Sequence, residues 1–429
     1  IGNIAQQLYN TVDSIVVGKY VGDNALAAVG SASPILNLLL VLFIGISMGT
    51  SIMVSQFFGA KDRESLSKTI GSTITLTAVS SLIIMVLGSV TIRPLLKMLN
   101  TPASIIDWCT SYLLILIVGI MGVAYYNMFC GILRGLGDSL SALVYLLVAT
   151  VINIVLDLWF VAGLQMGVAG VALATVIAQM VSAVLCFFKL KRMTDVFDLK
   201  FKYLKPDMEN IMTILRLGLP SGITQAIFSM AMVVVQSLTN SFGEMVIAAN
   251  VIIMRVDGFA MMPNFSFGTA MTTYSGQNVG AREFDRVHKG AKQGTIIAAG
   301  TSAAITGLIL IFGKYLMGIF TNTSELVTLS ANMMKILAVG YIAMAVTQSL
   351  SGVMRGAGDT MTPMWISIVT TVFIRVPLAY GIAHFTKTPE LPGGRYECIW
   401  VSLLISWVLG AVLTVVFYRI GKWKNKGLE

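Results

Sequence analysis

Apolar stretches of about 20 residues recur along the chain, and they limit its fold more than any other feature. A helix of that length crosses the hydrocarbon core of a bilayer, so each stretch predicts a membrane-spanning helix. Hydrophobic residues make up 56% of the chain and charged residues only 11%, which excludes an ordinary soluble domain. We expect twelve spans, at residues 1–18, 33–56, 70–91, 108–129, 140–161, 167–189, 212–239, 245–271, 290–312, 333–353, 361–383 and 398–418.

The basic residues lie almost wholly in the loops between these stretches, and most of them lie on one side of the membrane. The positive-inside rule therefore predicts that both termini are cytoplasmic. This distribution explains the net charge of +9, so we expect no nucleic-acid partner. Residue 1 is Ile and the first span has no polar leading end, so part of the first helix is expected to be missing.

Cysteine and histidine are too few and too scattered in the chain to form disulfides or metal sites. We predict neither disulfides nor a cysteine metal site, and two histidines do not suffice for zinc motifs. The four cysteines, within or beside spans and without pair spacing, are Cys109, Cys130, Cys186 and Cys398.

The chain contains an internal repeat with an offset of 221 residues. GILRGLGDS at residues 131–139 returns as GVMRGAGDT at residues 352–360, and SQFFGAKD at residues 55–62 returns as GQNVGARE at residues 276–283. Two motifs at one offset indicate two homologous six-span halves in a parallel arrangement. The predicted domains are a bundle at 1–190, a charged cytoplasmic linker at 191–210 and a bundle at 211–429.

A polar stripe runs through the first span, in QQLYNTVDSIVV at residues 6–17. Gln6, Tyr9 or Asn10, and Asp13 follow the three-to-four spacing that places side chains on one helix face. A carboxylate at bilayer depth costs roughly 2.5 to 3.5 kcal/mol, so such groups usually face a cavity and have a function. The stripe therefore predicts a transporter whose driving ion acts at Asp13.

Two further spans carry polar pairs one helical turn apart, Asn153 with Asp157 and Thr175 with Gln179. Neighbouring helices would present these pairs to Asp13. Two carboxylates with amide and hydroxyl oxygens form either a Na⁺ site or a pair that shares a proton, and the sequence does not choose between them. The plain alternative is that Asn153 and Thr175 only join helices by hydrogen bonds.

The second half does not duplicate these acids, because the repeat offset aligns Asn153 with Ile374 and Asp157 with Leu378. An ion site is therefore not expected there. Charge in that half occurs at Arg255, Asp257 and Arg375, which we regard as candidates for a polar cavity. One hypothesis pairs Asp257 with Arg375, and the alternative is that Arg375 extends to the lipid headgroups.

The chain resembles the multidrug and toxic compound extrusion (MATE) family. The features that carry the resemblance are the doubled R-G-x-G-D and G-A-K/R turns, VDSIVVG at residues 12–18 and the twelve-span repeat. The resemblance implies two six-helix bundles in a V shape around a central cavity, which export organic cations in exchange for Na⁺ or H⁺. Within the family the chain is similar to the DNA-damage-inducible efflux proteins, whose coupling residues lie in the N-terminal half. The positions that match that branch are Gln6, Tyr9, Asp13, Asn153, Asp157 and Thr175, whereas Cys130 departs from it.

The sequence thus predicts an all-α integral membrane protein that acts as a secondary active multidrug antiporter in the bacterial inner membrane. Its expected partners are cationic amphipathic small molecules and membrane lipid, with H⁺ or Na⁺ as the coupling ion, no cofactor and a monomeric state. The alternative is a flippase of a lipid-linked saccharide. An enzyme is not expected, because no reactive side chains cluster at one face, and a receptor is not expected, because no loop is long enough for a soluble domain.

Overall fold

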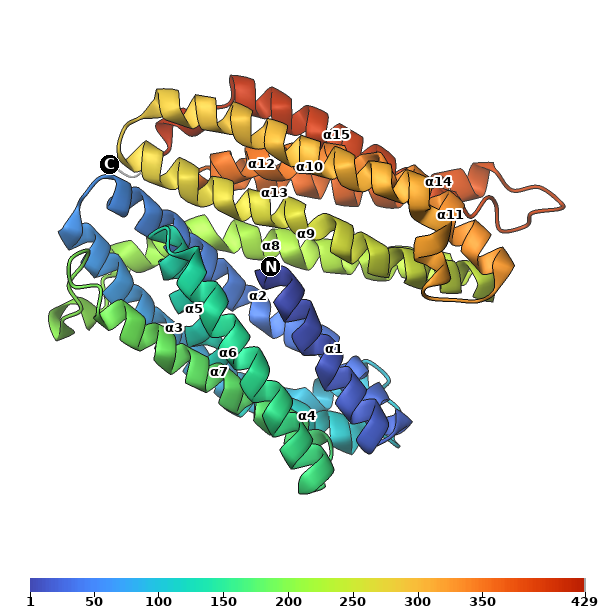
Figure 1. Cartoon of the computed structure of the whole chain (residues 1–429), viewed down its shortest axis with the longest axis horizontal. Helices are drawn as coiled ribbons and strands as arrows, with labels where there is room; N and C mark the ends of the chain where they lie inside the picture. Colours follow the sequence, from blue (N-terminus) through green and yellow to red (C-terminus); the bar gives the residue numbers. More distant parts are fainter. Residues whose placement is uncertain (428–429) are drawn as a thin grey trace. The chain divides into compact units, whose positions relative to one another are not determined.

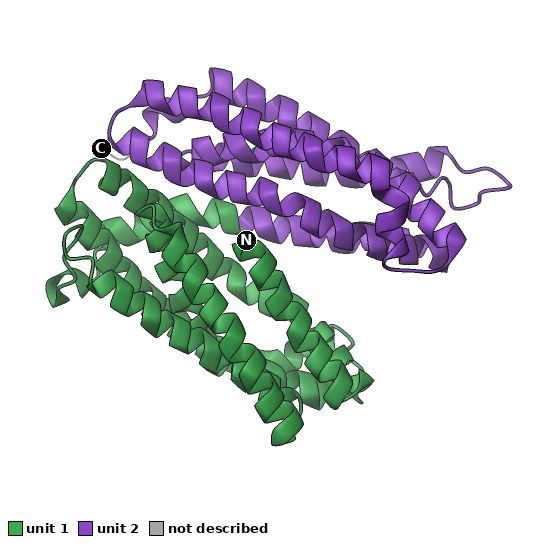
Figure 2. Cartoon of the chain, viewed as in Figure 1, with its two compact units in different colours: residues 1–222 green, residues 223–429 purple. Residues whose placement is uncertain are grey.

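The computed structural model describes residues 1–427, and within them helices joined by short loops form the whole structure (Figure 1). The chain divides into two compact units, Ile1–Gly222 and Ile223–Glu429, shown separately coloured in Figure 2. The division falls inside one long helix, and residues 191–210 belong to the first unit. The sequence-based domain boundaries at residues 190 and 211 stay predictions.

The first unit contains the first six predicted spans. One of them is divided into α4 and α5, and another ends in a π-helix, η1. Its elements are α1 (Gly2–Tyr20), α2 (Asp23–Gly59), α3 (Arg63–Met98), α4 (Ile106–Val118), α5 (Ile120–Gly135), α6 (Ser139–Asp157), η1 (Leu158–Gly163), α7 (Val168–Lys191), the 3₁₀-helix η2 (Phe201–Leu204) and the first half of α8 (Met208–Asn240).

The second unit repeats this plan, again with one span bent and one interrupted by a π-helix. Its elements after α8 are α9 (Glu244–Gly280), α10 (Phe284–Gly318), α11 (Ser324–Ala338), α12 (Gly340–Gly356), α13 (Met361–Ile368), the π-helix η3 (Val369–Arg375), α14 (Val376–Phe385), α15 (Cys398–Ile420) and the 3₁₀-helix η4 (Trp423–Asn425).

The helices account for all the predicted spans. Within residues 1–427, nine helical segments are long and apolar enough to cross a membrane, and two bent pairs raise this number to 11. The pairs are α4 with α5, bent by 52°, and α11 with α12, bent by 41°. The remaining predicted span is α1, whose polar side chains make it less hydropathic than the others. The bends are not predicted by the sequence, because no proline marks either break.

The repeated motifs form turns at equivalent helix junctions of the two units. Gly137 and Gly358 have φ values of 89° and 99°, a left-handed conformation that glycine adopts without strain. The aspartate that follows each glycine accepts a backbone N–H at the start of the next helix, Asp138 from Ser141 at 3.0 Å and Asp359 from Thr362 at 3.2 Å. The repeated sequence motif therefore forms the same glycine turn and the same aspartate N-cap in both units.

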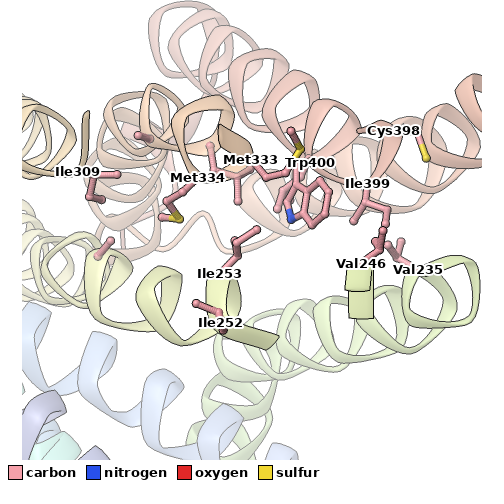
Figure 3. Close-up of a cluster of buried hydrophobic side chains, with 14 of the residues drawn as sticks. Val235, Val246, Ile252, Ile253, Ile309, Met333, Met334, Cys398, Ile399 and Trp400 are labelled. Atoms are coloured by element: carbon pink, nitrogen blue, oxygen red, sulfur yellow. The ribbon is translucent and has the colours of Figure 1, made fainter. Parts of the chain in front are cut away.

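The core of the second unit is rich in aromatic and thioether side chains. Figure 3 shows the indole of Trp400, from α15, close to Met333 and Met334 of α11 and Ile253 of α9. Trp400 is only 1% exposed. Methionine packs well around a rigid ring because its unbranched side chain adapts to irregular gaps.

Small residues bring the first half of α8 against α2 within the first unit. A Cβ atom added at Gly218 would collide with the backbone carbonyl of Gly45, and one added at Gly49 would collide with the carbonyl of Ile214. Close backbone approach of this kind is a common way for helices to associate in membranes, where apolar side chains gain little by leaving lipid.

Replacing Gly218 by Ala should lower the free energy of unfolding by about 1–3 kcal/mol, because the added methyl group has no space against α2. The measurement is the thermal unfolding temperature of the purified protein in detergent. Gly30→Ala in α2 is the control, since no atom lies within 4 Å of the added Cβ, and it should be neutral or slightly stabilising. Equal unfolding temperatures for Gly218→Ala and wild type would contradict the packing argument.

Candidate ion site in the first unit

Asp13 lies on the buried face of α1 and is 8% exposed. Tyr9, one turn before it, is 3% exposed, and Val16 and Val17, one turn after it, are also buried. This face packs against α6 and α7, so the carboxyl group of Asp13 enters the interior of the first unit. Of the predicted polar stripe, Tyr9 and Asp13 therefore lie on this buried face.

Asp13 accepts hydrogen bonds from both neighbouring helices. Nδ2 of Asn153, in α6, donates to Oδ1 at 2.7 Å, and Oγ1 of Thr175, in α7, is 3.5 Å from Oδ2. The first contact is short, and the second is at the limit of a hydrogen bond. Asn153 is fully buried. The structure thus brings together three residues that are far apart in sequence.

Asp157 is fully buried and close enough to Asp13 for the two carboxyl groups to interact directly. Neither of its oxygens has a hydrogen-bond donor among the described residues. A hydrogen bond between the two acids would require a proton on one of them, because ionised carboxylates only accept. A buried unpaired carboxylate is unfavourable, so this site needs a cation or a proton.

Several other oxygens around the acids also lack partners among the described residues. They are Oδ1 of Asn153, Oε1 of Gln179 and the hydroxyl group of Tyr9. Carboxylate, amide and hydroxyl oxygens are the ligands that hard cations prefer. The donor set therefore fits Na⁺ as a transported ion, and the carboxyl pair equally fits a shared proton.

The backbone changes where Asp157 ends α6. Residues Leu158–Gly163 form the π-helix η1, in which the N–H of Leu164 bonds to the carbonyl of Trp159. π-helical turns inside helices are often found at functional sites, since they displace side chains and carbonyl groups from the regular register. The second acid of the site thus lies where the helix is locally rearranged.

Tyr112 of α4 is a buried polar residue beside α1 that sequence reasoning missed. It is 8% exposed and belongs to the buried cluster that contains Val16 and Val17 of α1. No sequence signal identifies it, because a tyrosine in an apolar span is ordinary and its span is bent in the structure. Only the packing of α4 places its ring in this cluster.

The other predicted cavity residues have different surroundings. Gln6 and Asn10 lie on the exposed side of α1, and Arg255 is exposed on α9. In the second unit, Tyr341 donates to Oδ1 of Asp257 at 2.9 Å, and the described residues contain no ion pair between Asp257 and Arg375. Arg375 belongs to η3, is 9% exposed, and its Nε atom has no partner among those residues.

Comparison with known families identifies the chain. The family model described as MatE matches residues 1–159 and 220–381, which is most of the chain and includes Asp13, Asn153 and Asp157 of the site. The chain belongs to the MatE family. This confirms the resemblance drawn from the repeated turns and from the first span. The assignment to the branch of DNA-damage-inducible efflux proteins stays a prediction.

Curated relatives of this MatE protein cover nearly its whole length. The probable multidrug resistance protein YoeA of Bacillus subtilis is 30% identical, over 99% of this chain and 92% of its own. The probable multidrug resistance protein NorM of Thermotoga maritima is 24% identical, over 99% and 91%. Bacterial relatives of this extent indicate a multi-pass protein of a bacterial membrane.

Solved structures of transporters in the same superfamily have the same fold. MATE structures described as being in the straight and in the bent conformation each match with a TM-score of 0.90 at 25% identity, over 98% of this chain and 92% of theirs. A MOP superfamily transporter from Pyrococcus furiosus matches equally well. The expected fold class, an all-α integral membrane protein, is confirmed, and so is the expectation of a transporter rather than an enzyme.

The two contacts of Asp13 should differ in strength. Asn153→Leu removes a short hydrogen bond with little change of volume and leaves Oδ1 of Asp13 without this donor, so it should lower the free energy of unfolding by about 1–3 kcal/mol. Thr175→Val removes a contact of 3.5 Å and should cost well under about 1 kcal/mol. Thermal unfolding in Na⁺-free detergent solution at neutral pH gives both values.

Asn10→Leu, on the exposed side of α1, is the matched control and should leave the unfolding temperature unchanged. A cost for Thr175→Val equal to that for Asn153→Leu would contradict the order of the two contacts.

Proposed function

We propose that this protein is a secondary active efflux antiporter that exports amphipathic organic cations in exchange for H⁺ or Na⁺. The observation that supports the coupling site is the buried carboxyl pair, Asp13 and Asp157, of which Asp157 has two oxygens without donors among the described residues. Relatives named as probable multidrug resistance proteins support the substrate class. The proposed location is the bacterial inner membrane, with both termini cytoplasmic, and the protein acts as a monomer without a cofactor.

Coupling follows from the hydrogen bonds that the site gains and loses. With a cation between the acids, the oxygens of Asp157 are satisfied, and α1 is held against α6 and α7 through Asp13. When the cation leaves, two buried carboxylates repel each other, and this packing of α1 becomes less favourable. Occupancy by the ion therefore biases the first unit between two arrangements of α1, which is the requirement for ion-driven transport.

The same argument applies to a proton and to Na⁺, but the two ions need different ligands. A proton needs only the two acids. A sodium ion needs further oxygen ligands, which Asn153, Thr175 and Gln179 offer. Substitutions of these three residues should therefore weaken Na⁺ coupling more than H⁺ coupling.

Ethidium efflux from proteoliposomes tests the proposed function. Export should be driven by an imposed Na⁺ gradient or pH gradient and should fall at least tenfold in Asp13→Asn, because the amide takes up no proton and lacks the negative charge that attracts Na⁺ (about 1.4 kcal/mol for each factor of ten). Asp107→Asn is the matched control: this exposed aspartate at the start of α4 is paired with Arg93 at 3.1 Å, so efflux should be unchanged.

The outcomes distinguish the alternatives. Loss of export in Asp13→Asn under one gradient identifies the ion and supports coupling in the first unit. Export that persists in Asp13→Asn would overturn the proposed role of the site. No export by wild type under either gradient would overturn the drug antiporter and direct the search to lipid-linked saccharides.

The two acids should act as one unit. If they share one cation, Asp13→Asn and Asp157→Asn each remove its site, and the double variant should be no more impaired than either single variant. The measurement is the initial rate of gradient-driven efflux in all four proteins. Losses that multiply in the double variant would show that the acids act independently.

A further inference from the structure

The segment that follows α7 is held firmly against α3 by polar contacts. Arg63, at the start of α3, donates to the carboxylate of Asp198 at 2.9 Å and to the carbonyls of Thr194 and Asp195. The N–H of Asp198 donates to Oγ of Ser67 at 2.8 Å. Phe197 is 1% exposed in the same core. Residues 194–198 are therefore a fixed part of the first unit and not a free tether.

The same segment then places η2 farther along α3. The hydroxyl group of Thr75 donates to the carbonyl of Leu204, and Gly71 provides the space in which the backbone of Tyr203 approaches α3. A residue with a Cβ atom at position 71 would collide with that backbone. The position of η2 along the helix axis is thus set by two contacts one turn apart.

This position corresponds to the boundary of the apolar surface of α3. Val79 is the first large apolar side chain of α3 that is exposed, and it lies four residues, or about 6 Å, beyond Thr75. Exposed apolar side chains continue from there, with Leu82, Ile83 and Val86 each more than half exposed. Exposed apolar side chains on a membrane-spanning helix are expected to face lipid, so we expect η2 at the level where the hydrocarbon core meets the headgroups.

The side chains of η2 match that level. Phe201 is 91% exposed, which is costly in water but favourable at a lipid interface. Lys200, Lys202 and Lys205 surround it, all exposed and without an ion pair among the described residues. An exposed aromatic ring among unpaired lysines is typical of segments that bind anionic membrane surfaces.

The acids within residues 198–207 do not cancel the charge of these lysines, because Asp198 is paired with Arg63 and only Asp207 remains against three lysines. The guanidinium group of Arg63 holds the pKa of Asp198 below its ordinary value, and Lys200 and Lys202 act in the same direction from farther away. Asp207 accepts from the N–H of Glu209 at 3.1 Å and from Asn210 at 3.0 Å. A net positive charge therefore remains at η2.

We propose that residues 200–205 form an interfacial site for the headgroup of an anionic phospholipid, in the leaflet that borders this end of α3. The ammonium groups of the lysines bind the lipid phosphate, and the ring of Phe201 inserts among the upper parts of the acyl chains. The site ties the connection between the two halves to the membrane surface. It does not depend on the transported substrate or on the coupling ion.

Hydrogen–deuterium exchange of the full chain in nanodiscs tests the proposal. Residues 199–207 should exchange several-fold more slowly in discs of phosphatidylcholine with phosphatidylglycerol than in phosphatidylcholine alone. The loop at residues 386–397 of the second unit serves as an internal reference and should not change. For Lys202→Gln, the fraction of phosphatidylglycerol that gives half-maximal protection should rise about fivefold.

Two triple variants separate this site from a general effect of charge. Replacing Lys200, Lys202 and Lys205 by Gln should abolish the protection. Replacing the exposed lysines near the C-terminal ends of α1, α3 and α10, namely Lys19, Lys97 and Lys314, by Gln removes the same charge and should preserve it.

Further arms test the two parts of the site. Phe201→Ser should reduce the protection, since the lysines alone remain, and high salt should weaken it, since exposed charges are screened. Equal exchange in the two kinds of disc would overturn the proposal. Full protection in phosphatidylcholine discs on addition of soluble glycerol phosphate would also overturn it, because free phosphate and not lipid would then be the ligand.

Discussion

The absence of water in the hydrocarbon core is the constraint on which this structure depends. Every backbone N–H and C=O group there needs a partner within the protein, and this requirement produces the long helices of both units. A departure from regular helix therefore marks a place where the backbone has special surroundings. The π-helix η1 directly follows Asp157, and the π-helix η3 ends at Arg375, so both breaks adjoin a buried charged group. Backbone irregularity and buried charge occur together.

The two halves share their turns but differ in their buried polar groups. Asp138 and Asp359 perform the same helix-start role, and each has a lysine partner, Lys189 at 3.7 Å and Lys426 at 3.0 Å. Inside the bundles this symmetry is lost. The first unit has the pair of acids, whereas Asp257 of the second has a tyrosine donor in Tyr341. The repeat thus preserves the scaffold, and the buried polar groups differ between its copies.

The role of a charged residue in this protein depends on its depth in the membrane. Asp13 and Lys202 are common residue types, but one lies in the interior of a helical bundle and the other at the edge of an apolar surface. The low dielectric constant around Asp13 favours a bound cation or a proton there, and exposed lysines beside an apolar surface favour anionic headgroups. Under the two proposals, electrostatic attraction acts at both depths, for coupling at Asp13 and for anchoring at Lys202.

The sequence by itself indicated the apolar membrane-spanning helices, the internal repeat and the buried position of Asp13 in α1, because hydropathy and helical spacing are local properties of the chain. It also indicated that Asn153 and Thr175 accompany Asp13, since each lies on a span with a second polar residue one turn away. Only the tertiary structure decided that Asn153 is the close partner of Asp13 and Thr175 the distant one. It also decided that Gln6 and Asn10 are exposed and that η2 contacts α3 at Thr75, one turn before the exposed apolar side chains of α3 begin. Those facts depend on how helices rotate and slide against one another, which long-range packing sets and local pattern does not.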